Sequence, residues 1–220
     1  MVMKHILGTL FLFFLFLPSP FSQYTSASES DPEALKLLKQ AGESMSATNT
    51  QINFSLKVSL PGEEGTPSAG VLYQSGKSYH LQLDDYSIIS DGKTRWVYLK
   101  RANEVNLYNE TNGQDWVSPQ DFLQFHTATD LVFVFAGTKP DGTSTIEAKP
   151  LKGRFEDYSK FTITVKNGNL STIKSLAKDG TRQELKLGTM THPSTLDAKK
   201  LFTFNAALYP GVHIEDLRLD

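Results

Sequence analysis

The sequence predicts a mainly β (α+β) protein built on one large antiparallel sheet. Apolar and polar residues alternate strictly over 52–60, as expected of a strand with one buried and one wet face. Tight-turn pairs such as Asp91-Gly92, Asn167-Gly168 and Asp179-Gly180 separate short apolar runs. Strands and helices do not alternate as they do in a parallel sheet. We therefore expect about ten or eleven strands in a sheet that curls, because larger flat sheets are rare.

The first 22 residues predict a secretory signal peptide. Lys4 and His5 form a basic start, residues 6–17 are almost all apolar, and 18–22 are small or turn-forming. The apolar run is shorter than the roughly 20 residues of a membrane-spanning helix, which disfavours an uncleaved anchor. With no cysteine, the chain has neither disulfides nor a lipidated N-terminal cysteine. We expect one exported, soluble domain over 23–220 that is not lipid-anchored.

An amphipathic helix is predicted to open the mature domain. Asp31 is a suitable N-cap, Pro32 suits the first helical position, and Glu33 lies in the first turn. Apolar residues then follow at helical spacing through Met45. A helix with one apolar stripe is expected to cover part of the sheet.

Six short strands are predicted next, followed by an ambiguous middle and a second set. The first set is 52–60, 70–74, 79–83, 88–89, 96–99 and 105–108. Serine, proline and aspartate at 118–121 indicate a short helix over 118–125. The run 131–137 fits either a helical continuation or a strand buried on both faces. The second set is 146–151, 161–165, 170–177, 183–187 and 201–204, before a final segment at 210–214.

No pattern in the chain indicates catalysis, a metal or another cofactor. None of the five histidines is spaced as a metal-ligand pair, and nucleophile-elbow and phosphate-loop motifs are absent. His80 is interpreted as an ordinary polar strand position, and Glu63-Glu64 and Asp84-Asp85 as solvated turn charges. A net charge of −2 offers nucleic acid no broad electrostatic attraction. We predict a protein that is not an enzyme and does not bind nucleic acid.

Too little helix is predicted to cover the apolar side of so large a sheet. This mismatch favours an apolar guest such as lipid, although any single residue in the set fits an ordinary core equally well. The candidate lipid-binding residues on the inner sheet face are Phe54, Leu56, Val58, Tyr73, Leu81, Leu83, Ile89, Trp96, Tyr98, Leu107, Phe161, Ile163, Val165, Phe202 and Phe204. The candidate movable cover, or lid, is Leu35, Leu38, Met45, Phe122 and Phe125.

The order of these features resembles the periplasmic lipoprotein carrier family, the LolA-type chaperones. The matching pieces are the signal peptide without a following cysteine, the amphipathic helix, the strand INFSLKVSL at 52–60, and Gly70-Val71-Leu72-Tyr73. The hairpin at 88–98 contains Ser-Asp-Gly-Lys-Thr followed by Arg-Trp-Val-Tyr, and the chain ends with Phe202-Thr203-Phe204 and Pro210-Gly211-Val212. The resemblance spans nearly the whole mature chain.

The resemblance implies an incomplete antiparallel β-barrel of about eleven strands with a helical lid. It also implies a monomeric carrier in the periplasm that holds the acyl chains of lipoproteins. The implied partners are acylated lipoproteins or lipid, an inner-membrane releasing complex and an outer-membrane acceptor.

One departure concerns an arginine that helps to hold the lid closed in this family. Residues 74–79 contain none, and Lys77 and His80 are the candidate substitutes. Two alternatives stay open: an exported binder of another apolar ligand, and a β-sandwich interaction module without a cavity.

Overall fold

A computed structural model describes residues 24–45, 49–110 and 125–218, and these form one twelve-stranded sheet. The strand order is β12-β6-β5-β4-β3-β2-β1-β11-β10-β9-β8-β7, which leaves β12 and β7 at the two edges, so the sheet is open. All neighbouring pairs are antiparallel except β12 with β6. The strands are β1 (Asn49–Ser59), β2 (Ser68–Ser75), β3 (Ser78–Gln82), β4 (Tyr86–Ser90), β5 (Thr94–Leu99), β6 (Glu104–Asn109), β7 (Leu131–Thr138), β8 (Thr143–Pro150), β9 (Tyr158–Lys166), β10 (Asn169–Ala177), β11 (Arg182–Thr191) and β12 (His213–Asp216).

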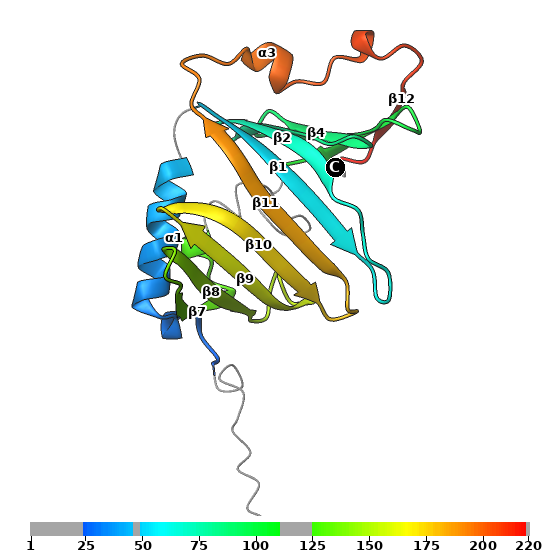
Figure 1. Cartoon of the computed structure of the whole chain (residues 1–220). Coiled ribbons are helices and arrows are strands. Elements are labelled where there is room, and N and C mark those ends of the chain that lie inside the picture. The colour runs from blue at the N-terminus through cyan, green and yellow to red at the C-terminus, as the bar shows by residue number, and fades with distance from the viewer. Residues whose placement is uncertain (1–23, 46–48, 111–124, 219–220) are drawn as a thin grey trace, which may run out of the picture.

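The sheet curls, and its two faces carry different cover. Helix α1 (Pro32–Met45) lies against β7, β9 and β10 (Figure 1). We call the face on which α1 packs the inner face. The C-terminal segment, with the short helix α3 (Ala198–Leu201), crosses the other side of the sheet, above β2 and β4 in Figure 1. That side is the outer face.

Helix α1 confirms the amphipathic pattern read from the sequence. Asp31 accepts a hydrogen bond from the backbone N–H of Glu33 at 2.9 Å, which satisfies one free donor of the first turn. Ala34, Leu38, Ala41 and Met45 are at most 3% exposed. Their spacing places them on one side of the helix, which is the side that contacts the sheet.

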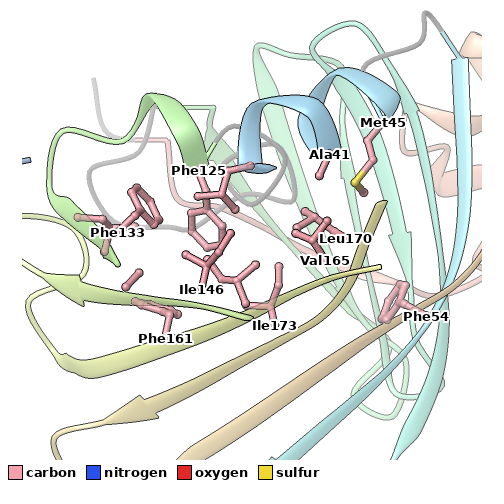
Figure 2. Close-up of a cluster of buried hydrophobic side chains, with 14 of the residues drawn as sticks. Ala41, Met45, Phe54, Phe125, Phe133, Ile146, Phe161, Val165, Leu170 and Ile173 are labelled. Atoms are coloured by element: carbon pink, nitrogen blue, oxygen red, sulfur yellow. The ribbon is translucent and has the colours of Figure 1, made fainter. Parts of the chain in front are cut away.

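The largest part of the core lies between α1 and the inner face of β7–β10. Figure 2 shows Ala41 and Met45 directed toward Val165 and Leu170. Below the other end of the helix, Phe125 of the 3-10 turn η2 (Phe125–Thr127) lies 6.0 Å from Phe161 between ring centroids. Apolar side chains from β7, β8 and β10 complete this cluster, namely Phe133, Ile146 and Ile173.

The predicted hairpin at 88–98 is confirmed as β4 and β5, joined at Asp91-Gly92. Gly92 has a φ of 86°, a region that disfavours residues with a Cβ. Asp91 Oδ1 accepts hydrogen bonds from the backbone N–H groups of Lys93 and Thr94, each at 2.8 Å. The aspartate side chain thus closes the turn locally, as its position in the sequence predicted.

Three sequence expectations are settled or corrected by the fold. The ambiguous run at 131–137 is the edge strand β7, not a helix. The predicted strand at 201–204 is wrong: Asp197 Oδ1 accepts a hydrogen bond from the Lys200 N–H at 3.1 Å and caps α3, and Phe202 follows as its C-cap. The final segment does form a strand, β12, but it pairs parallel to β6 and departs from the all-antiparallel prediction.

Several expectations lie outside the described residues. These are the signal peptide at 1–22, most of the predicted helix over 118–125, and Phe122 of the predicted lid.

Candidate lipid-binding face

An apolar row crosses the inner face of β1 to β5. Cross-strand register places Ile52, Leu72, Leu81, Ile88 and Val97 opposite one another in turn. Directly paired residues share a face of the sheet. All five belong to the hydrophobic core or pack against it, and Ile52 and Ile88 are at most 2% exposed.

A second row continues this surface across the other half of the sheet. Leu56 of β1 pairs with Leu185, which is followed by Ile173, Ile163 and Ile146 on β10, β9 and β8. Because Ile52 and Leu56 lie on the same strand, β1 joins the two rows into one continuous apolar face. Phe54 lies between them, and its ring packs over Gly70 on β2. A Cβ at position 70 would lie only 2.3 Å from Phe54 Cζ, so the glycine makes room for the ring.

Eight predicted binding residues, Val165 among them, lie on this inner face. Phe54, Leu83, Phe161 and Ile163 are buried, and Leu56 and Leu81 are partly buried. Val58 lies on the same side of β1 but is 43% exposed, beyond the packed part of the face. Of the predicted cover, Leu38, Met45 and Phe125 are buried and Leu35 is partly buried against the core.

The other predicted residues lie on the outer face, which corrects the sequence prediction. Register places Tyr73, His80, Ile89, Trp96 and Leu107 opposite one another in turn. This row faces away from the row that contains Leu72 and Ile88, because side chains alternate along a strand. Tyr98 is two residues from Trp96 and shares its face. Phe202 and Phe204 belong to the segment that covers this side.

Aromatic contacts hold the C-terminal segment against the outer face. The rings of Tyr98 and Tyr209 are 4.5 Å apart between centroids, and Phe204 stacks on Tyr209 at 4.9 Å. The Tyr98 hydroxyl donates to Asn103 Oδ1 at 3.1 Å, and Asn103 Nδ2 donates to the Pro210 carbonyl at 3.2 Å. These residues therefore form a second, smaller core, and Tyr98 is a structural residue of it.

His80 belongs to this second core and is 7% exposed. Burial lowers the pKa of its imidazole to about 4, although a backbone hydrogen bond with Leu201 acts in the opposite direction. The ring lies 6.3 Å from that of Tyr73 and its Nε2 is 3.2 Å from the Gln82 amide nitrogen. His80 is therefore a buried, neutral structural group at pH 7, and not the ordinary polar strand position predicted from the sequence.

The inner face ends in polar residues at one side. Register places Thr50, Gln74, Tyr79, Ser90 and Arg95 in turn beside the apolar row. We call these five residues the polar row. Arg95 Nη1 is 3.8 Å from Glu110 Oε1, and the Tyr79 hydroxyl donates to Glu110 Oε2 at 3.2 Å. The arginine also lies over the ring of Tyr108, 5.1 Å from its centroid.

Arg95 is a third candidate for the role of the family's lid-holding arginine, which residues 74–79 lack. Lys77 is exposed in the β2–β3 turn, and His80 is on the outer face, so neither candidate substitute reaches the inner face. Arg95, at 8% exposure, supplies a buried cation there from β5. The alternation of Arg95, Val97 and Leu99 groups these residues on one face of β5, and the register with β4 shows that it is the inner face.

Several inner-face residues were missing from the predicted set. The alternation rule that selected Leu81 also selects Tyr79, and pairing with Leu81 selects Leu72 and Ile88. The sequence shows that residues alternate along each strand. It does not show the register between strands, which decides which alternate residues lie on the inner face. Burial of the Tyr86 ring near this face raises the pKa of its hydroxyl.

Within the described part of the chain, no group of three or more histidine, cysteine or acidic side chains is arranged to hold a metal ion. Among the helices formed by residues 24–45, 125–127 and 198–208, none has the length and apolar character needed to cross a bilayer.

Comparison with known families identifies the chain. The family model described as outer membrane lipoprotein carrier protein LolA matches residues 82–205. The chain belongs to the LolA family. The match covers the hairpin of β4 and β5, the whole β7–β11 half and the start of the C-terminal segment. It describes a carrier protein and not an enzyme. No curated protein sequence matches the LolA-like chain.

The chain is also similar to solved structures. An uncharacterized conserved protein from Thermus thermophilus superposes with a TM-score of 0.55 at 10% identity, covering 84% of this chain and 99% of that one. A LolA superfamily protein from Nitrosomonas europaea gives 0.42 at 13% identity, covering 78% and 97%. LprF from Mycobacterium bovis gives 0.41 at 13% identity, covering 76% and 97%. At 10% identity, the likeness to the Thermus thermophilus protein concerns the fold alone. The single sheet rules out the two-sheet sandwich considered from the sequence.

Proposed function

We propose that this LolA-family chain binds the acyl chains of lipoproteins on its inner face and carries them through the periplasm toward the outer membrane. The observation that supports it most directly is the continuous apolar surface that β1 builds from the row of Ile52 and the row of Leu56. Helix α1 packs on β7, β9 and β10, at one side of that surface. Acyl chains are the natural ligands of such a face, since they offer no hydrogen bonds.

Burial of hydrocarbon is sufficient to drive this binding. Each methylene transferred from water contributes about 0.8 kcal/mol. A single long acyl chain therefore offsets the several kcal/mol that association costs in lost freedom. The proposed binding residues are those predicted residues that lie on the inner face: Phe54, Leu56, Val58, Leu81, Leu83, Phe161, Ile163 and Val165, together with Ile52, Leu72, Ile88 and Val97. Leu35, Leu38, Met45 and Phe125 are the proposed cover.

The carrier role further implies partners. We propose that the protein acts as a monomer that receives acylated lipoproteins from an inner-membrane releasing complex and passes them to an outer-membrane acceptor. The family match supports this sequence of contacts, and residues 1–22 would direct the export that it needs.

The test uses a photoactivatable benzophenone side chain at Leu81 or at Leu107. Both are partly buried strand leucines, but Leu81 of β3 lies on the inner face and Leu107 of β6 on the outer face. The delipidated protein is mixed with a synthetic dipalmitoylated lipopeptide and irradiated. We expect cross-linking from position 81 and at least fivefold less from position 107. Equal cross-linking from both positions, or none from 81, contradicts binding at the inner face.

Competition separates the carrier from an exported binder of another apolar ligand. Unlabelled phosphatidylglycerol with the same palmitoyl chains is added during irradiation. A lipoprotein carrier should keep most of its cross-linked lipopeptide at equimolar competitor. If phosphatidylglycerol displaces the lipopeptide completely, the cargo is a free lipid and the carrier proposal fails.

A further inference from the structure

The inner face is polarised along its strands, from the polar row at one end to apolar residues at the other. Gln74 of the polar row is followed on β2 by Leu72 and then Gly70, with Phe54 opposite. On β3, Tyr79 is followed by Leu81 and Leu83. On β2 and β3 the inner face thus runs from hydrogen-bonding side chains to apolar residues.

Gln74 is the member of the polar row with an unused acceptor. Its Oε1 is buried and accepts no hydrogen bond within the described parts of the chain. A buried acceptor left unpaired destabilises the folded protein, so natural proteins rarely retain one. Its neighbours are engaged: Thr50 Oγ1 donates to the Met45 carbonyl at 3.3 Å, and Ser90 Oγ accepts from the Gly92 N–H at 3.0 Å.

The charges at this end balance one another. Arg95 and Glu110 are 10% and 12% exposed in their side chains and lie 3.8 Å apart, so among the described residues the β5 end of the polar row carries one cation and one anion. A ligand head with its own net charge would be buried here without a partner, which is unfavourable. An uncharged head that donates a hydrogen bond would pair with the free Gln74 Oε1 and would leave the charges of Arg95 and Glu110 balanced.

We propose that the polar row receives the neutral, hydrogen-bond-donating linkage of an acylated ligand, with Gln74 Oε1 as the acceptor. This inference rests on the proposed function and orients the ligand. The head lies at Gln74, between its cross-strand neighbours Thr50 and Tyr79, and the acyl chain runs over Leu72 and Leu81 toward Phe54 and Leu83. The donor is either the amide N–H of an acylated peptide or a hydroxyl of an acylglycerol.

The first test compares ligands with one palmitoyl chain on the unmodified protein. Each displaces the hydrocarbon dye diphenylhexatriene from the delipidated chain. N-palmitoyl-glycinamide and monopalmitoylglycerol can donate a hydrogen bond, methyl palmitate cannot, and palmitate at pH 8 is charged. We expect at least one donor ligand to bind about tenfold more tightly than methyl palmitate, since a satisfied buried acceptor contributes on the order of 1 kcal/mol. Palmitate should bind no better than methyl palmitate.

The two donor ligands identify the source of the linkage. Tighter binding of N-palmitoyl-glycinamide indicates an acylated peptide, and tighter binding of monopalmitoylglycerol indicates a glyceride. Equal affinity of both donor ligands and methyl palmitate overturns the inference. Preference for palmitate overturns it as well, because it requires an uncompensated cation.

The second test removes the acceptor. Gln74→Met keeps the length of the side chain and should abolish the preference for the donor ligand, while diphenylhexatriene binding stays within twofold. The matched control is Gln51→Leu, on the neighbouring strand but facing outward opposite Tyr73, which should change neither ligand. If Gln74→Met keeps the preference, or weakens dye and donor ligand equally, Gln74 is structural and the inference fails. Wild-type protein that binds no dye and no palmitoyl ligand would instead refute the proposed function.

Discussion

Ile88 and Ile89 are adjacent residues of β4, equally buried, and belong to different cores. Ile88 is 2% exposed and contributes to the inner face with Leu81 and Val97. Ile89 is 3% exposed and lies between His80 and Trp96 beneath the C-terminal segment. Burial and apolar character therefore do not distinguish the proposed ligand-binding wall from the structural layer on the other side of the sheet. The two residues differ only in the face of the sheet on which each lies.

The outer face also differs between the two halves of the sheet. On β9 to β11 and β1, the outer face carries charged residues such as Lys57, Lys160, Lys174 and Glu184, which surround a shallow polar depression of about 300 Å³. On β2 to β6, the same face is apolar and covered. A ligand-binding role confined to the inner face predicts that outer-face changes alter stability without altering lipid binding.

The largest effect is expected from Phe161→Ala on the inner face. Its ring contacts those of Phe125, Phe155 and Tyr158 at centroid distances of 6.0, 5.3 and 4.9 Å. Removing a buried aromatic ring lowers the free energy of unfolding by about 3–5 kcal/mol. Phe204→Ala, on the half-exposed outer layer, should cost less than half as much. Urea denaturation of both variants measures the difference, and an equal loss would show that the outer layer packs as tightly as the main core.

A pH effect is expected from His80, because its folded-state pKa of about 4 lies below the ordinary value of 6.5. As the pH falls through this window, the unfolded chain binds a proton that the folded chain excludes. The protein should therefore lose stability between pH 6.5 and pH 4, by an amount on the order of 3 kcal/mol.

The measurement is the free energy of unfolding as a function of pH for wild type and His80→Gln. The variant should show a shallower decline over that window. Since His80 is on the outer face, diphenylhexatriene binding at pH 7 should be unchanged in the variant. A parallel decline in both proteins would assign the acid sensitivity to other groups.

A smaller pair of changes tests the two faces directly. Ile88→Val and Ile89→Val each remove one methylene and should each cost about 0.5–1.5 kcal/mol of stability. Only Ile88→Val removes a contact with a bound acyl chain, so only it should weaken palmitoyl-ligand binding, by about threefold. Equal effects of both variants on binding would show that the ligand does not distinguish the faces.

The smallest effect is expected on the charged part of the outer face. Lys174 Nζ lies 3.5 Å from Glu184, and the lysine side chain is 56% exposed. Exposed ion pairs contribute at most about 1 kcal/mol, so Lys174→Ala should shift stability by less than that and leave lipid binding unchanged. A large loss of binding in this variant would place a ligand site on the outer face.

The sequence alone determined most of the local structure. The alternation at 52–60, the Asp-Gly and Asn-Gly turns and the cap of α1 predicted the strands, hairpins and helix that are present, because these features depend on neighbours along the chain. The same local alternation misled at 201–204, where a capped helix and two aromatic residues anchor a crossing segment instead of a strand.

Only the tertiary structure decided which apolar residues line the inner face. Strands β2 to β6 are covered on both sides and carry apolar residues on both faces. The sequence of such a strand does not say which of its two faces meets the core under α1. Cross-strand register and the path of residues 192–212 separated Leu81 from Trp96 and placed Arg95 in the same row as Gln74. These are contacts between strands and segments distant in sequence, so they are fixed by packing of the whole sheet and not by any single strand.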